Sequence, residues 1–176
     1  MARRHWSLFA RDTRGATAVE FAVLAPIFFA LLGAILQTAL TFFAAQVLES
    51  AMNDTSRAIR IGQALRESWT VSDFKSGVCN RLYGLFGSCS DLHVDVRQIN
   101  SFADANIAVP LDLNCQKNCN WTEPDRWTTG DASSVMLVQV YYRYPVILKF
   151  GPSSSADLAD GRHLLSSATI FRNEPF

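Results

Sequence analysis

One long apolar run dominates the hydrophobic pattern of this chain. Residues 21–45 form a stretch of 25 positions in which Gln37, Thr38 and Thr41 are the only strongly polar side chains. At about 1.5 Å per residue, a helix over this run is roughly 38 Å long, which exceeds the roughly 30 Å hydrocarbon core of a bilayer. The pattern therefore predicts one tilted membrane-spanning helix, and no other segment has a comparable run.

The helical pattern continues beyond the apolar run but becomes amphipathic. Apolar or small residues recur at positions 47/48, 51/52, 55, 58/59, 62 and 65, with charged residues between them. This spacing predicts that the helix leaves the membrane and continues with one apolar face. Pro26 lies in the first turns of the span and is expected to bend it.

The remaining residues, roughly 130, suffice for one domain of modest core and predict an α+β fold. An antiparallel sheet of three or four strands should pack on the continuing helix. We expect a second helix over 71–86, a half-buried strand over 92–97, a strand over 106–109, a loop over 111–133, a strand over 135–150 with Pro145 at a bulge or edge, a connection over 151–161 and a last strand over 163–172.

Charge predicts the orientation of the span. Arg3, Arg4, Arg11 and Arg14 against Asp12 give the first fifteen residues a net charge of +3, and the rest of the chain carries −3. Because positive flanks stay inside, the N-terminus is expected in the cytoplasm, and the segment after about position 45 is expected to be exported. The exported part has no excess of basic residues, so no nucleic-acid partner is predicted.

A cleaved secretory signal is the alternative for the N-terminal segment. The apolar run is longer than the 7–15 residues of a signal-peptide core, and Phe43-Ala44-Ala45-Gln46 lacks small residues at both positions that a signal peptidase requires. The sequence therefore favours an anchor that stays in the chain.

Glu20 is a carboxylate just inside the apolar segment, where a charge is costly and marks a functional site by default. Taken alone, it is better explained as a residue at a helix start, where the macrodipole favours negative charge. Its context is more specific. Gly15, Ala16, Glu20 and Phe21, preceded by a basic leader, resemble the processing site of type IV prepilins.

That resemblance implies that a membrane prepilin peptidase cuts between Gly15 and Ala16, which makes Glu20 the fifth residue of the mature chain. The new amino group and the Glu20 carboxylate then lie within about one helical turn. They can pair within one chain or between neighbours, which removes the cost of an isolated charge.

Three separated motifs make the resemblance more specific. They are Gly-Ala-Thr-Ala-Val-Glu-Phe-Ala from Gly15, the amphipathic continuation ending at Gly62-Gln63, and the C-terminal Phe171-Arg172-Asn173-Glu174-Pro175-Phe176. Together they resemble TadE-like pseudopilins, minor pilin-like proteins of the bacterial tight-adherence, or Flp, pilus. The resemblance implies a leader over 1–15, a transmembrane helix over 16–45 and a periplasmic domain over 46–176.

All four cysteines lie on the expected periplasmic side, and an even number in an oxidising compartment indicates two disulfides. Of the three connectivities, we favour Cys79 with Cys89, closing a short loop after a helix, and Cys115 with Cys119 within the polar loop. A four-cysteine zinc site is the alternative, but the spacings do not match paired C-x2-C knuckles, so no metal is expected.

The sequence contains no enzyme motif. His5, His93 and His163 have no adjacent nucleophile or metal-binding motif, and a lone strand histidine is usually solvated or capping. Two loop tryptophans, Trp121 and Trp127, are expected to pin the loop more readily than to form a recognition patch. A tyrosine cluster, Tyr141, Tyr142 and Tyr144, is expected to pack in the sheet.

We therefore predict a structural protein without catalytic residues or cofactors. Its expected partners are the inner membrane, the prepilin peptidase, and other pilin-like and pilus assembly proteins. The alternative is an uncut single-pass anchor that presents a periplasmic binding domain of an envelope or secretion complex.

Overall fold

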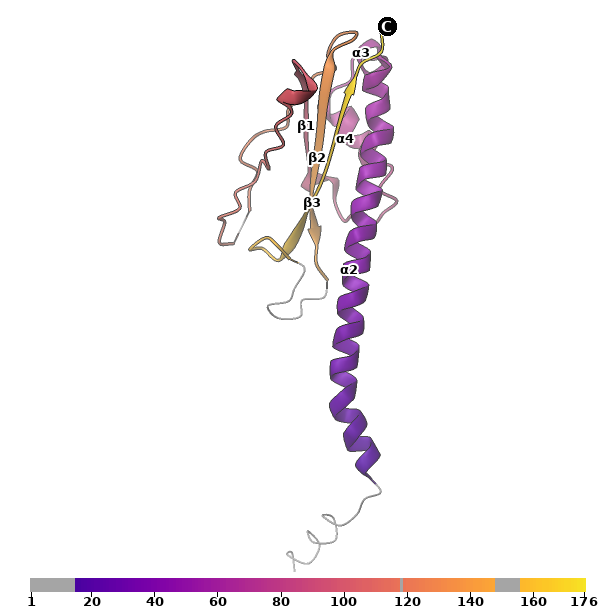
Figure 1. The fold of residues 1–176 in the computed structure, drawn as a ribbon, viewed down its shortest axis with the longest axis vertical. Coiled ribbons are helices and arrows are strands. Elements are labelled where there is room, and N and C mark those ends of the chain that lie inside the picture. The colour runs from indigo at the N-terminus through magenta and orange to yellow at the C-terminus, as the bar shows by residue number, and fades with distance from the viewer. Residues whose placement is uncertain (1–14, 118, 148–155) are drawn as a thin grey trace, which may run out of the picture.

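A single long helix forms one side of the molecule, and a small sheet packs against its C-terminal half (Figure 1). The computed structural model describes residues 15–117, 119–147 and 156–176. Helix α2 (Ala16–Arg60) contains 45 residues and runs without a break through Pro26 and through the end of the predicted span at position 45. The predicted α+β class, with a long N-terminal helix on an antiparallel sheet, is confirmed.

Two shorter helices follow α2. Helix α3 (Gln63–Arg66) is separated from α2 by Gly62, whose φ of +71° favours glycine and ends the long helix. Helix α4 (Val71–Cys79) begins with a capping box, in which the Thr70 hydroxyl accepts from the Asp73 amide and the Asp73 carboxylate accepts from the Thr70 amide. Single 3₁₀ turns cover Cys89–Asp91 and Phe102–Asp104.

The predicted helix over 71–86 is wrong in its second half, because α4 ends at Cys79. Beyond it, Tyr83 and Gly84 both have positive φ, which an α-helix cannot continue through. Leu82 and Phe86 are nevertheless buried in the core. The turn segment thus buries the same apolar positions whose spacing predicts a helix.

Three antiparallel strands form the sheet in the order β1-β2-β3: β1 (Leu92–Ile99), β2 (Val135–Pro145) and β3 (Arg162–Arg172). The register pairs Ile99 with Val135 and Val135 with Arg172, so these residues mark one end of the sheet. The opposite end is the pair Pro145 and Arg162. The first end lies beside the C-terminus of α2 and the second points toward its N-terminal half (Figure 1).

Residues 106–109, predicted as a strand, are extended but pair with no strand in the described part of the chain. Side chains hold this segment instead, since Arg97 donates to the carbonyl of Asn106 and the Tyr141 hydroxyl donates to that of Ala108 at 3.0 Å. Side-chain hydrogen bonds therefore hold this segment, whereas a strand is held by backbone hydrogen bonds to a neighbouring strand. The sequence pattern of a strand does not distinguish the two cases.

Strand β1 is buried on both faces over Leu92–Val96, which corrects the prediction of a half-buried strand. The loop over 111–133 folds back across its polar face, and residues 95 and 126 form a parallel bridge along the edge of β1. The loop thus hides His93 and Asp95, which the alternation had assigned to solvent.

The core lies between the sheet and the C-terminal part of α2. Buried residues of α2 recur at intervals of four and three, which keeps one side of the helix facing the domain. We call this row the seam: Gln37, Thr41, Ala44, Leu48, Ala51, Met52, Thr55, Ser56, Ala58 and Ile59. It packs mainly on β3 and α4, with Val94, Val96, Val138, Val140 and Phe74 in the same core.

The C-terminal motif closes the far end of this interface. Asn173 is buried, and its side-chain amide donates to the carbonyls of Thr129 and Asp131 at 3.1 and 3.0 Å. The Glu174 amide donates to the carbonyl of Arg60 at 2.8 Å, satisfying an acceptor at the end of α2. The ring of Phe176 lies against Gly62, so close that a Cβ there would stand 2.5 Å from it.

All four cysteines are paired, Cys79 with Cys89 and Cys115 with Cys119, which are the pairs that the sequence favoured. No thiolate remains for the zinc alternative.

The tryptophans pack on the domain: Trp121 stacks on His93, and the Trp127 indole donates to the carbonyl of Trp69 at 2.8 Å. All three tyrosines of the cluster are buried in the sheet, as predicted.

Candidate functional site

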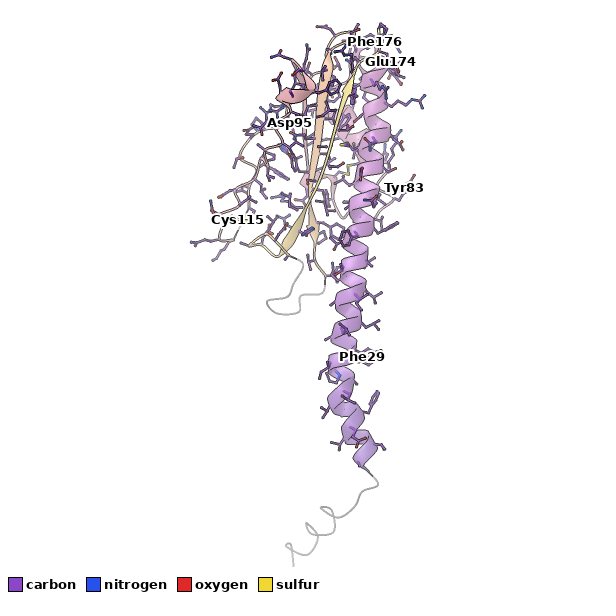
Figure 2. All side chains as sticks on the ribbon, viewed as in Figure 1. Phe29, Tyr83, Asp95, Cys115, Glu174 and Phe176 are labelled. Atoms are coloured by element: carbon purple, nitrogen blue, oxygen red, sulfur yellow. A yellow bond between two sulfur atoms is a disulfide. The ribbon has the colours of Figure 1, made fainter. Side chains whose placement is uncertain are left out.

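The N-terminal half of α2 stands free of the domain (Figure 2). Between Ala16 and Leu36 no residue is buried, and the first buried residue is Gln37. Large apolar side chains are exposed all round this part of the helix: Val19, Phe21, Val23, Leu24, Ile27, Phe28, Phe29, Leu31, Leu32, Ile35 and Leu36. We call residues 16–36 the free segment. It belongs to the one helix in the described chain that is long and apolar enough to cross a membrane.

Gly15 immediately precedes the free segment and occupies the N-cap position of α2. Its φ of −95° and ψ of −2° are open to any residue, and no atom lies within 4 Å of the position of a Cβ. A side chain there would meet no neighbour among the described residues beyond those adjacent in sequence. The described part of the fold therefore does not require glycine at this position.

Ala16, Glu20 and Phe21 all lie in the first two turns of α2, and all are exposed. Ala16 is the first helical residue, and Glu20 follows it by four positions, so both side chains share one side of the helix. Glu20 is also the sole charged residue between Arg14 and Glu49. The structure thus places the predicted processing residues at the helix start, with the leader outside the described residues.

Two polar residues of the apolar run bond within α2. The Thr38 and Thr41 hydroxyls donate to the carbonyls four residues earlier, Ala34 and Gln37, at 2.9 and 3.0 Å. Gln37 and Thr41 belong to the seam and are 2% and 8% exposed. These two buried side chains therefore present almost no surface to another helix in this structure.

Within the described part of the domain, the buried histidine is His93, and the cluster around it holds the loop on the sheet. Asp125 accepts from Lys75 at 2.6 Å and from the Val94 amide at 2.8 Å, and its other contact is His93 Nδ1 at 3.2 Å. Burial lowers the pKa of His93, and the opposing attraction of Asp125 is the smaller effect. The buried imidazole is therefore neutral near pH 7, which corrects the expectation of a solvated residue.

A second ion pair holds the same loop, since Arg126 donates to both carboxylate oxygens of Asp95 at 3.1 and 3.0 Å. Arg143 lies over the Trp121 ring at 5.0 Å from its centre. Among the described residues no group of three metal-ligating side chains comes together. These groups bond to one another and to the backbone, an arrangement that fixes the loop on β1.

Comparison with protein families gives one match. The sequence model of the TadE-like protein family matches residues 15–57. This segment is TadE-like. Comparisons with curated proteins and with solved structures gave no match.

The TadE-like segment begins at Gly15 and extends over the free segment and most of the seam. The resemblance predicted from sequence is thereby confirmed for this quarter of the chain. The C-terminal motif lies outside the match, and its contacts with Arg60 and Gly62 supply a structural role for it. Sequence reasoning missed Asn173 as a buried anchor, because an isolated asparagine after a strand gives no signal of burial.

Proposed function

We propose that this protein is a minor, pseudopilin-like structural component for assembly of a tight-adherence pilus. In this proposal it is inserted with its N-terminus in the cytoplasm and cut between Gly15 and Ala16 by a prepilin peptidase. The free segment then anchors the mature chain in the inner membrane and packs with other pilin-like helices, while the domain lies in the periplasm and has no catalytic role.

The observation that carries the proposal is the position of Gly15. It is a glycine without an internal structural requirement, at the boundary between a basic leader and a membrane-length helix. The resemblance to prepilins gives a reason for this glycine, because it implies a peptidase that must accommodate the backbone at the cut.

Glu20 fits the same proposal through electrostatics. A cut after Gly15 creates a positive amino group at the first residue of α2, where the macrodipole is already positive and disfavours it. Glu20, four residues on, supplies the compensating charge in a segment that has no other charged residue. Pairing with the amine of a neighbouring chain would serve assembly in the same way.

The first test is the N-terminus of the protein extracted from membranes, measured by mass spectrometry in cells with and without the peptidase. We expect Ala16 as the first residue only when the peptidase is present. Gly15→Val should leave the chain inserted but uncut. Gly87→Val is the matched control, since Gly87 also has no atom within 4 Å of a Cβ position, and this variant should be cut normally. An intact leader in wild-type cells would favour the uncut anchor of an envelope complex instead.

The second test separates the carboxylate from the fold. Glu20→Gln should be inserted and folded but should reduce piliation, counted by electron microscopy. Glu49→Gln is the matched control, because Glu49 is the next charged residue along the same helix and is also exposed. Normal piliation with Glu20→Gln would assign Glu20 to the helix start alone.

A further inference from the structure

The contact between α2 and its domain begins within one bilayer thickness of Glu20. A helix needs about 20 residues to cross the hydrocarbon core, so a core that starts after Glu20 ends near Leu40. The seam, however, already begins at Gln37, where the side chain is 2% exposed. Strand β3 reaches the same level, because its residues His163 and Leu165 line a groove together with Thr38 and Thr41 of α2.

The part of the domain at this level is the Pro145–Arg162 end of the sheet, which points toward the free segment (Figure 1). Ile147 follows β2 there and is 73% exposed, although it is a large apolar side chain. On α2, Leu40, Phe42 and Phe43 are also exposed at the end of the apolar run. We call these four residues the proximal patch. The three helix residues continue the exposed apolar surface of the free segment, and Ile147 follows Pro145 at the end of the sheet that points toward this segment.

A groove opens beside this patch, between α2 and β3. Thr38, Thr41, Phe42 and Ala45 line it from the helix, and His163 and Leu165 line it from the strand. Its volume is about 200 Å³, below the roughly 300–1,000 Å³ of sites that enclose a whole small molecule. Both threonine hydroxyls already donate within the helix, so the groove offers mainly apolar contact.

Charged residues near the groove limit how deep this end can lie. Arg162 pairs with Asp160 at 2.6 Å and with Asp91 at 3.0 Å, and His163 Nδ1 lies 3.3 Å from Asp157. Paired charges are tolerated among headgroups but are costly in hydrocarbon. This end of the sheet is therefore suited to the interface, with only the apolar side chains reaching toward the acyl chains.

We propose that the proximal patch and the groove form a lipid-contacting surface, which rests the domain on the membrane and accepts part of a phospholipid acyl chain between α2 and β3. The occupant is lipid because the surface is continuous with the free segment and lies at the bilayer boundary set by Glu20. The proposal needs insertion of α2 but does not depend on cutting at Gly15 or on pilus assembly.

Photolabelling of the full chain tests the groove. The protein is reconstituted in phosphatidylcholine vesicles that contain phosphatidylcholine with a diazirine on one acyl chain, and it is then irradiated, reduced and digested with trypsin. Cleavage after Arg162 and Arg172 releases β3 as residues 163–172, a segment remote from the span in sequence. We expect lipid adducts on this peptide as well as on α2, and adducts on α2 alone would overturn the proposal.

A pair of adjacent substitutions gives the matched control. Thr38→Trp places a bulky ring in the groove and should abolish most labelling of residues 163–172. Ala39→Trp lies on the next position, is exposed and does not line the groove, so labelling should persist. Equal labelling in both variants would overturn the assignment. The assignment would also be overturned if labelling fell as the protein density in the vesicles rose, because a second copy of the chain would then compete with lipid for the groove.

The patch is tested separately with an environment-sensitive fluorophore on a single added cysteine. Ile147→Cys should give blue-shifted emission that doxyl-labelled phosphatidylcholine quenches. Phe102→Cys is the matched control, because Phe102 is 53% exposed but follows β1 at the opposite end of the sheet. Emission from position 147 that aqueous iodide quenches as strongly as emission from position 102 would overturn the proposal.

Discussion

The free segment and the seam belong to one continuous helix, but their side chains lie in different surroundings. The free segment exposes apolar side chains in every direction, whereas the seam buries one row of residues and leaves charged residues such as Glu49 and Asp54 on its other sides. The difference follows from the solvent. In lipid no face needs to be polar, while in water only the face covered by the sheet can remain apolar.

The surroundings of a side chain in α2 can be inferred only when its exposed fraction and its hydrophobicity are considered together. Leu36 and Leu48 are the same residue type in the same helix, yet they are 54% and 0% exposed. Truncating each tests a different environment, because one side chain is exposed on the free segment and the other lies in the protein core. The comparison thus makes direct predictions about stability.

The largest effect is expected from Leu48→Ala. Removal of this core side chain should lower the free energy of unfolding of the domain by about 2–5 kcal/mol, through lost burial and the cavity left behind. Leu36→Ala should change it by less than about 0.5 kcal/mol. Urea unfolding in detergent micelles, followed by tryptophan fluorescence, measures both. Equal losses would contradict the division of α2 into free segment and seam.

Removal of the first disulfide should have the next largest effect, confined to the domain. Cys79→Ser with Cys89→Ser opens a loop with a sequence separation of 10 and should cost about 2–4 kcal/mol of unfolding free energy. Cys115→Ser with Cys119→Ser opens a separation of only 4, so less chain entropy is released and the loss should be smaller. Unfolding under non-reducing conditions gives the order, and a reversed order would contradict the loop-length argument.

A smaller loss is expected at the far end of the seam. Asn173→Ala removes the donor from two buried carbonyl contacts and should cost about 1–3 kcal/mol of unfolding free energy. Glu174→Gln is the control: its pairing with Arg60 is 3.8 Å long and both side chains are more than half exposed, so a change of at most about 1 kcal/mol is expected. If the two variants lose the same stability, the C-terminal motif does not act through Asn173.

The smallest predicted effect is a pH dependence that belongs to the domain alone. Burial lowers the pKa of His93, so the unfolded chain binds a proton more readily than the folded one. Stability from the neutral imidazole is therefore present above the ordinary pKa of about 6.5 and decreases as pH falls below it. Unfolding free energies measured between about pH 8 and pH 5 should show this slope.

His93→Gln should flatten that slope, whereas Trp121→Phe, which keeps the histidine and an aromatic ring against it, should retain it. Asp125, Lys75, Asp95 and Arg126 surround the imidazole in both variants. An unchanged slope in His93→Gln would assign the pH dependence to another group.

The local sequence pattern predicts well those parts of the fold in which apolar residues recur with one dominant period. The long N-terminal helix, the start of α4 at Val71 and strand β3 follow directly from an apolar run, helical periodicity and alternation. The predicted strand over 135–150 begins as β2 does but is longer, because β2 ends at Pro145, and positions 148–150 lie outside the described residues. Errors occurred where long-range contacts replaced local ones. The segment over 80–86 buries Leu82 and Phe86 without a helix, and the loop over 111–133 covers a strand face that alternation assigns to water.

For the candidate site, the sequence supplied the residues and the structure supplied their surroundings. Gly15, Ala16, Glu20 and Phe21 were identified from spacing and resemblance, and their processing stays a prediction. That Gly15 has an open Cβ position, however, is visible only once the neighbours are placed. The burial of Gln37 and Thr41 in the seam is likewise a property of the folded chain that the apolar run alone does not reveal.

The sequence by itself determined the length of the apolar run, the single charge at Glu20 within it and the amphipathic continuation, since these depend on local order and on transfer between water and lipid. Only the tertiary structure decided where the domain meets the helix, which side of α2 it covers and what the C-terminal residues hold. Those contacts join positions more than a hundred residues apart, such as Arg60 and Glu174, and no local preference specifies them.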